Sequence, residues 1–335
     1  MATIKDISKE TGLGLATISK YINGGNVRDE NKVIIENAID KLGFTANNLA
    51  RGLKTGKSYT VGVVIPEFEN VFVTTIITVI ADVLREKGYG IIVCDCRTDE
   101  VRERDVIKFF MGKMVDGIIS MPSSSSGDHL LPAIESGIPI LLLDRMIPEL
   151  KDKVSAVLVD NVSASYSAVK LLIEAGHKDI GVILGPQDVF TAQQRFLGYN
   201  QALIQYSITP CQSHIEFSDY SIQGGYESMM RLLSNSSITA VYATNFYMTH
   251  GAIIALNEQG YNIPEKISFV GFDAMEISRV IKPKLTIVSQ PLNEIGMHAA
   301  EIMLKKLFGS IENTPEIITL PGELIVGESV RQLKD

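Results

Sequence analysis

Apolar side chains in the first 44 residues recur at the spacing of short amphipathic helices. The first predicted helix starts at Thr3-Ile4-Lys5-Asp6, a sequence with capping-box spacing, and runs to about Thr11. Gly12 then permits a tight turn. A second short helix can begin near Leu15, where apolar residues at 18, 21 and 22 share one face.

A third predicted helix runs from about Asn31 to Leu42 and ends at Gly43. The apolar positions expected to face inward on this helix are Val33, Ile34, Ala38, Ile39 and Leu42. Three short helices with a glycine turn between the first two form a helix-turn-helix, whose second helix enters the major groove of DNA. Small helical bundles of other kinds share this spacing, so the pattern alone leaves both interpretations open.

From Tyr59 onward, short apolar runs alternate with helical segments, a pattern that predicts an α/β fold with parallel sheets and right-handed crossovers. The predicted strands are Val61–Ile65, Gly90–Cys94, Gly117–Met121, Ile138–Leu143, Ala156–Val159, Ile180–Leu184, Ala240–Thr244, Ile267–Phe272 and Thr286–Gln290. This number of strands exceeds one doubly wound sheet of ordinary size, so we expect two lobes with a cleft between them.

The composition is that of a globular protein, with 335 residues, 45% of them hydrophobic and 21% charged. No apolar run approaches the ~18 residues of a membrane span, and the N-terminus lacks the continuous apolar stretch of a secretory signal. These features predict a cytoplasmic protein without membrane association. Three cysteines, Cys94, Cys96 and Cys211, form neither a disulfide framework nor a set of zinc ligands. The sequence also lacks a glycine-rich phosphate loop and a nucleophile elbow. We therefore expect no cofactor, no metal and no enzymatic activity.

Charge is distributed unevenly along a chain whose net charge is −8. Residues 1–58 carry a net charge of +3, and residues 59–335 carry −11. A small basic unit joined to a large acidic one is typical of a nucleic-acid-binding head on a body with another role.

Ligands in parallel sheets bind beyond the carboxyl ends of the strands, and this rule selects candidate site residues without reference to any family. The polar and aromatic residues at such strand ends or in the following loops are Glu67, Asn70, Phe72, Asp144, Arg145, Arg195, Asn245, Asp273 and Gln290. Planar polar side chains together with an aromatic ring suit a polyhydroxylated ligand. Any one of them could instead be a helix cap or a surface pair.

The amino-acid sequence of the N-terminal segment resembles the head of the lactose/galactose-repressor (LacI/GalR) family of transcriptional regulators. The resemblance rests on Thr-Ile-Lys-Asp-Ile-Ser at 3–8, Ala-Thr-Ile-Ser-Lys-Tyr-Ile-Asn-Gly at 16–24, Leu-Gly-Phe at 42–44 and Asn-Asn-Leu-Ala-Arg-Gly-Leu at 47–53, and it continues through nearly the whole chain. It implies an all-α helix-turn-helix head at 1–46, a hinge helix at 47–58 and an effector-binding and dimerisation body at 59–335.

The resemblance also implies DNA contacts for individual residues. The side chains of Thr3, Ser19 and Asn23 would contact DNA phosphates. Leu15, Ala16 and Lys20 would face the edges of the bases, and Thr17 belongs to the same motif. Ala50 and Leu53 share one face of the hinge helix, and Leu53 would insert into the minor groove; ordinary helix packing is the alternative. Two departures from the family pattern, Gly14 in place of Ser and Ala46 in place of Pro, could weaken DNA binding.

The body resembles the type I periplasmic sugar-binding proteins. Its N-terminal lobe would comprise about 59–160 and 290–319, and its C-terminal lobe about 161–289 and 320–335. The residues that match the polar set of pentose binders are Asn70, Phe72, Asp144, Arg145, Arg195, Asn245, Asp273 and Gln290, with Tyr220 as a stacking aromatic. Val71 and Phe246 depart from that pattern, and Phe246 puts the hydrogen bonding of its loop in doubt.

Together these features predict a DNA-binding regulator, a repressor that binds a palindromic operator as a homodimer. We expect a small neutral sugar, with a ribose-like pentose foremost, to bind the cleft and change the angle between the lobes. One alternative keeps the fold but has a purine or nucleoside corepressor as effector. Another is a cytoplasmic sugar-binding protein without DNA function.

Overall fold

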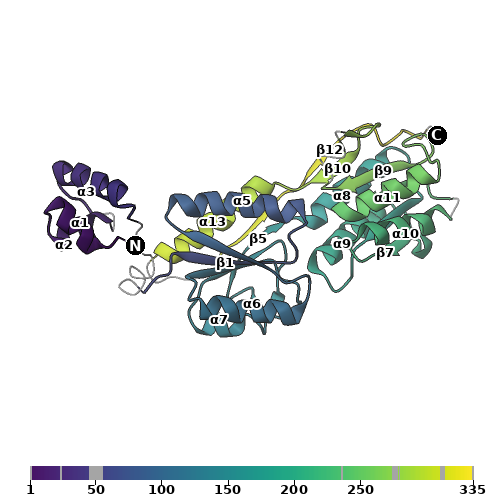
Figure 1. The fold of residues 1–335 in the computed structure, drawn as a ribbon. Coiled ribbons are helices and arrows are strands. Elements are labelled where there is room, and N and C mark those ends of the chain that lie inside the picture. Colours follow the sequence, from purple (N-terminus) through teal and green to yellow (C-terminus); the bar gives the residue numbers. More distant parts are fainter. Residues whose placement is uncertain are drawn as a thin grey trace. The chain divides into compact units, whose positions relative to one another are not determined.

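The computed structural model describes residues 2–22, 25–44, 56–234, 237–273, 278, 280–309 and 314–333. It consists of two compact units, Met1–Tyr59 and Thr60–Asp335 (Figure 1). The first unit is helical, and the second contains two parallel-sheet lobes. We describe each unit by itself.

The small unit is a three-helix domain with a helix-turn-helix at its start. Its helices are α1 (Ile4–Thr11), α2 (Leu15–Ile22) and α3 (Asp29–Leu42). The predicted capping box is present, because the Thr3 hydroxyl accepts the Asp6 N–H while the Asp6 carboxylate accepts the Thr3 N–H at 2.8 Å. Gly12 adopts the left-handed conformation expected for a tight turn. The predicted helices and turn are therefore confirmed.

The inward face of α3 differs from the prediction. Val33 and Ile34 are 56% and 44% exposed, whereas Ile35 is fully buried and packs with Ile7 and Ile18. Ile35, Ala38, Ile39 and Leu42 lie at the i, i+3, i+4, i+7 spacing of one helix face. A face that contains Ile35 leaves Val33 and Ile34 outside the core.

The large unit contains two six-stranded sheets. The sheet of the N-terminal lobe has the order β11-β5-β4-β3-β1-β2, with every pair parallel. Its strands are β1 (Thr60–Ile65), β2 (Gly90–Asp95), β3 (Gly117–Ser120), β4 (Ile140–Leu143), β5 (Ser155–Val159) and β11 (Ile317–Leu320).

The sheet of the C-terminal lobe has the order β12-β10-β9-β8-β6-β7. Its strands are β6 (Ile180–Leu184), β7 (Ile215–Phe217), β8 (Ala240–Ala243), β9 (Ser268–Phe272), β10 (Thr286–Ser289) and β12 (Glu323–Ile325). β12 runs antiparallel to β10, and the other pairs are parallel. Two parallel-sheet lobes confirm the predicted α/β fold class.

Helices cover both faces of each sheet (Figure 1). The helices of the N-terminal lobe are α5 (Val71–Glu86), α6 (Glu100–Gly112), α7 (Leu131–Glu135) and α13 (Leu292–Phe308). α5 and α13 pack together on one face, and α6 lies on the other with α7. In the C-terminal lobe the helices are α8 (Asn161–Glu174), α9 (Phe190–Gln205), α10 (Ile222–Leu233) and α11 (Phe246–Glu258), which form the pairs α8–α9 and α10–α11. Short 3₁₀ turns lie at Pro148–Leu150 and Gln212–His214.

Three strands, β7, β11 and β12, were not predicted from the sequence. Each lies at an edge of its sheet, has three or four residues, and is partly exposed. An edge strand of this length needs no continuous apolar run, so it lacks the signal that identified the central strands.

The chain passes between the two sheets three times, at 159–161, 289–292 and 320–323. Two of these crossings are bonded to each other, because the Asp160 N–H donates to the Leu320 carbonyl at 2.8 Å. None of the described helices combines the length and the apolar character that crossing a bilayer requires.

The close packing of α10 against α11 generates a prediction for stability. A Cβ atom on Gly251 would overlap the Ile222 carbonyl oxygen, a backbone atom held within α10. We expect Gly251→Ala to destabilise the body by about 1–3 kcal/mol, visible as a lower midpoint in thermal unfolding. Gly112→Ala is the matched control, because a Cβ there meets nothing within 4 Å and alanine favours the helix. Equal midpoints for the two variants would contradict this packing.

Candidate functional site

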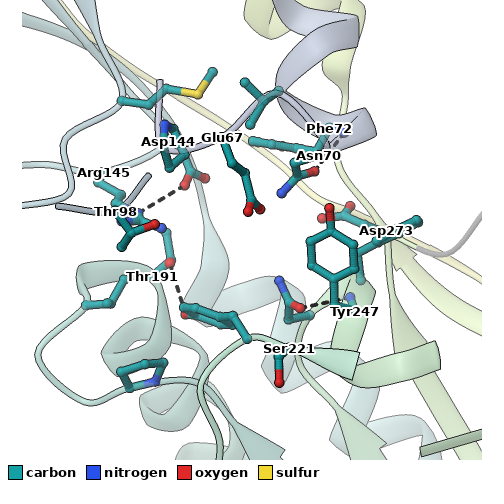
Figure 2. Close-up of a pocket in the computed structure, with 18 of the residues that line it drawn as sticks. Glu67, Asn70, Phe72, Thr98, Asp144, Arg145, Thr191, Ser221, Tyr247 and Asp273 are labelled. Carbon is teal, nitrogen blue, oxygen red and sulfur yellow. Dashed lines mark hydrogen bonds and ion pairs between the residues drawn. The ribbon is translucent and has the colours of Figure 1, made fainter. Parts of the chain in front are cut away.

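One cavity of about 480 Å³ lies between the carboxyl ends of the strands of the two lobes (Figure 2). It is lined by all nine residues that the sequence selected for the effector: Asn70, Phe72, Asp144, Arg145, Arg195, Tyr220, Asn245, Asp273 and Gln290. Segments separated by more than two hundred positions in sequence therefore meet at one place, and the shared position at strand ends is what brings them together.

Arg195 is the most firmly held side chain of the cavity and is only 5% exposed. Its Nε donates to Asn161 Oδ1 at 2.7 Å, and its Nη1 donates to the Thr244 carbonyl at 2.6 Å. The guanidinium carbon lies 3.8 Å from the centre of the Phe272 ring. These contacts fix the plane of the guanidinium, and among the described residues none bonds its Nη2. That group is oriented in advance and free to donate to a bound molecule.

Gln290, which is buried, and Asp273, which is half-buried, form a second polar part of the cavity. Gln290 Nε2 donates to Asp273 Oδ2 at 2.6 Å, while Gln290 Oε1 has no partner among the described residues although the side chain is buried. Burial raises the pKa of the Asp273 carboxyl to about 6, and the Arg195 charge and the Gln290 hydrogen bond act in the opposite direction. An orphaned acceptor beside a desolvated carboxylate is an arrangement that a hydroxyl donor would satisfy.

Two asparagines of the cavity serve as helix caps. Asn70 Oδ1 accepts the Phe72 N–H at 3.0 Å at the start of α5. Asn245 Oδ1 accepts the Tyr247 N–H at 2.9 Å and the Met248 N–H at 3.3 Å at the start of α11. Because capping uses only the oxygen, each amide nitrogen can still donate to a ligand. Each asparagine can therefore cap its helix and bind a ligand at the same time.

Four residues that line the cavity have left-handed backbones although none is glycine. The φ angles are 55° for Thr98, 65° for Asp144, 65° for Tyr220 and 56° for Asp273. Such conformations cost about 1–3 kcal/mol each and cluster at functional sites. They turn the chain sharply at the strand ends, which directs these side chains into the cavity.

Tyr220 and Arg145 are positioned by contacts with neighbouring residues. The Tyr220 ring packs directly on Gly185, where any Cβ would overlap it, and its hydroxyl lies 3.5 Å from Thr191 Oγ1. Arg145 Nη1 donates to the Pro122 carbonyl at 3.1 Å, and its Nε lies 3.6 Å from Asp144 Oδ2 (Figure 2).

The sequence-derived set omits several residues that line the cavity. They are Pro66, Glu69, Val73, Thr98, Met121, Pro186, Val189, Thr191, Asp219, Ser221, Ile222, Phe246 and Tyr247. The strand-end rule had drawn attention to Glu67 and would equally have found Tyr247, two residues after Asn245. Phe246 does not disrupt its loop, because Asn245 still caps α11 and Phe246 packs edge-on against Tyr247. No group of three or more metal-ligating side chains assembles among the described residues.

The DNA-facing residues predicted for the head are partly visible in the structure. Leu15, Ala16 and Lys20 are exposed on α2, whereas Thr17 and Ser19 are half-buried. The Thr3 hydroxyl takes part in the cap of α1. Gly14 has no side chain with which to cap α2, and its carbonyl accepts the Thr17 N–H at 3.0 Å. Asn23, Ala46, Ala50, Leu53 and most of the hinge segment lie outside the described residues.

Comparison with known proteins gives relatives along the whole chain. The periplasmic binding protein-like domain matches residues 169–330. The chain is 33% identical to the HTH-type transcriptional regulator RegA of Clostridium saccharobutylicum, over 98% of this chain and 99% of RegA. It is 30% identical to the HTH-type transcriptional repressor PurR of Haemophilus influenzae, over 99% of this chain and 100% of PurR. A LacI family transcriptional regulator from Enterococcus faecium, solved with bound ribose, matches with a TM-score of 0.72 and 29% identity, over 82% of this chain and 100% of that one.

The raised pKa of Asp273 generates a prediction about stability and pH. An acid whose pKa is higher in the folded state stabilises the fold below its ordinary pKa of 3.8, and this contribution is lost as the pH rises through about 6. Asp273→Asn stays uncharged, so we expect the variant without ligand to be more stable than the original at about pH 7.5, by about 1–3 kcal/mol.

The difference should shrink as the pH falls toward about 4.5. Denaturant unfolding of both proteins at the two pH values measures it. A variant that is less stable by the same amount at both pH values would show that attraction to Arg195 outweighs the cost of burial.

Proposed function

This chain belongs to the lactose/galactose-repressor (LacI/GalR) family of transcriptional regulators, and we propose that it is a repressor whose operator affinity is set by a neutral monosaccharide in the cleft. Like the relatives that match it along its whole length, the chain is a DNA-binding regulator and not an enzyme. The proposal adds the effector, the palindromic operator, the homodimer and the cytoplasm as the place of action.

The DNA-binding part of the proposal assigns α2 to the major groove. Leu15, Ala16 and Lys20 are exposed on this short helix, while Ile18 anchors its other face in the core. Lysine can donate to guanine O6 and N7, whereas leucine and alanine can make only apolar contacts, such as with a thymine methyl. Thr3, Thr17, Ser19 and Asn23 complete the proposed contacts, and Ala50 and Leu53 of the hinge would contact the minor groove.

The effector part of the proposal rests chiefly on one observation, the meeting of nine polar and aromatic residues in a single cavity. Arg195 Nη2, the amides of Asn70 and Asn245, and the oxygens of Asp273 and Gln290 supply donors and acceptors for hydroxyl groups. Phe72 and Tyr220 supply rings for the C–H face of a sugar. A relative of 29% identity was solved with ribose, which favours a pentose.

A purine or nucleoside corepressor is the second candidate effector. It is favoured by the 30% identity to a repressor named PurR. In that case binding in the cleft would strengthen operator affinity, whereas a sugar inducer would weaken it.

A ligand screen tests the effector proposal. We expect D-ribose to raise the thermal midpoint of the full chain, because a ligand at 100 times its Kd stabilises by about 2.7 kcal/mol. Asp273→Ala should lose this response, since the Asp273 carboxylate accepts hydrogen bonds from the sugar hydroxyls in the proposed complex. Calorimetry in which purine bases bind and no monosaccharide does would reject the sugar and support the corepressor.

Base readout by Lys20 is tested by binding-site selection on randomised DNA. Lys20→Ala should relax discrimination at one base position per half-site, worth about 1–3 kcal/mol if Lys20 reads guanine. Lys41→Ala removes the same charge from α3, where Lys41 pairs with Glu10, and should leave base preference unchanged. Weaker binding to all sequences by Lys20→Ala, with a salt slope lower by about one, would assign Lys20 to phosphate instead.

A further inference from the structure

The cavity contains more negative than positive side chains. Its carboxylates are Glu67, Glu69, Asp144, Asp219 and Asp273, and its cations are Arg145 and Arg195. Three of the carboxylates have partners in the protein: Asp144 with Arg145 at 3.6 Å, Asp273 with Gln290, and Asp219 with the Ser221 N–H at 3.0 Å. No ion pair of the described residues includes Glu67 or Glu69, and the neighbour that hydrogen-bonds Glu67 is the uncharged Asn70 side chain.

Glu67 and Glu69 differ in their surroundings although they are two positions apart. Glu67 is half-buried, whereas Glu69 is exposed. Figure 2 shows the Glu67 carboxylate turned toward the middle of the cavity from the N-terminal lobe, with Tyr247 on the opposite side. Burial and the neighbouring Glu69 charge raise the pKa of Glu67, while Asn70 and Arg145 oppose that shift. Glu67 therefore presents a partly desolvated negative charge to whatever occupies the cavity.

Gln290 provides a second acceptor in the cavity, and this acceptor lacks a donor. Gln290 is 6% exposed, and its Oε1 has no hydrogen-bond partner among the described residues. Gln290 joins the crossing at 289–292, and Glu67 follows β1, so the two acceptors come from different parts of the body. A molecule that satisfies both must bring hydrogen-bond donors, and hydroxyl groups do so without adding negative charge.

We propose that Glu67 is a specificity residue of the cleft, which accepts hydrogen bonds from the hydroxyls of an uncharged sugar and excludes sugars that carry a phosphate or a carboxylate. This inference rests on the proposed binding of a monosaccharide. A phosphate brings acceptor oxygens and charge of the same sign as Glu67, in a site where water screens poorly. An uncharged pentose or hexose brings only hydroxyls, which can donate to Glu67 and to Gln290 Oε1.

Calorimetry with D-ribose and D-ribose 5-phosphate on three full-length proteins tests this. In the original protein we expect ribose to bind about a hundredfold more tightly than its phosphate. Glu67→Gln should weaken ribose about tenfold and tighten the phosphate about tenfold, because a charge-assisted bond and a repulsion are both lost. Glu86→Gln makes the same change of charge at the exposed last residue of α5, outside the cavity lining, and should alter either affinity less than about threefold. D-glucose and D-glucose 6-phosphate form a second pair for a hexose effector.

The possible results separate this inference from the proposed function. Preference for the uncharged sugar that falls only in Glu67→Gln supports the inference. Equal effects of the two variants, or phosphate bound as tightly as ribose by the original protein, overturn the role of Glu67 and leave a sugar-controlled regulator. An original protein that binds neither member of either pair overturns the proposed effector as well. Thermal midpoints without ligand confirm that each variant is folded.

Discussion

The cleft depends on the burial of one guanidinium. An arginine that is 5% exposed must have its hydrogen bonds satisfied by the protein, since an unpaired buried charge is far too costly. The partners of Arg195 come from three places: Asn161 at the start of α8, Thr244 at the end of β8 and Phe272 at the end of β9. All three follow the first crossing in the chain and belong to the C-terminal lobe, so that lobe by itself holds the guanidinium in place. The groups of the N-terminal lobe, Asn70 and Glu67 among them, approach a ligand from the other side.

Backbone strain at the strand ends is offset by hydrogen bonds to the neighbouring strands. Asp144 and Asp273 both have left-handed backbones, yet the Asp144 N–H donates to the Val157 carbonyl at 3.0 Å and the Asp273 N–H to the Val288 carbonyl at 2.8 Å. The ladder of each sheet thus continues one residue beyond the strand and holds the turn in place. The same arrangement is present in both sheets, where a left-handed residue after a strand directs an acidic side chain into the cleft.

The sequence predicted those parts of the molecule that are determined by local periodicity. The capping box at Thr3 is a short local motif, the helices of the head have periodic apolar positions, and the central strands are continuous apolar runs. The strand-end rule found nine of the residues that line the cavity. The short edge strands β7 and β12 were not predicted, because neither contains a buried residue and each forms a strand only by pairing with a strand that is distant in sequence. Val33 and Ile34 were misassigned because a run of three apolar residues fits more than one helix face. The strand-end rule also selected Glu67, but its proposed role depends on partial burial in the cavity, which the sequence alone does not give.

The positions of Asn161 and Gln290 connect ligand contacts to the relative orientation of the lobes. Asn161 lies where the chain first passes from one sheet to the other, and Gln290 lies in the second crossing. Asn161 holds the Arg195 guanidinium at 2.7 Å, and its Nδ2 donates to Val159 within the same crossing at 3.2 Å. A molecule that bonds Arg195 and Gln290 therefore acts on side chains anchored in two of the three connections. A ligand shifts a conformational equilibrium only by its difference in affinity between the two states. Because Asn161 and Gln290 lie at connections between the lobes, bonds to these side chains or to Arg195 are where such a difference can arise.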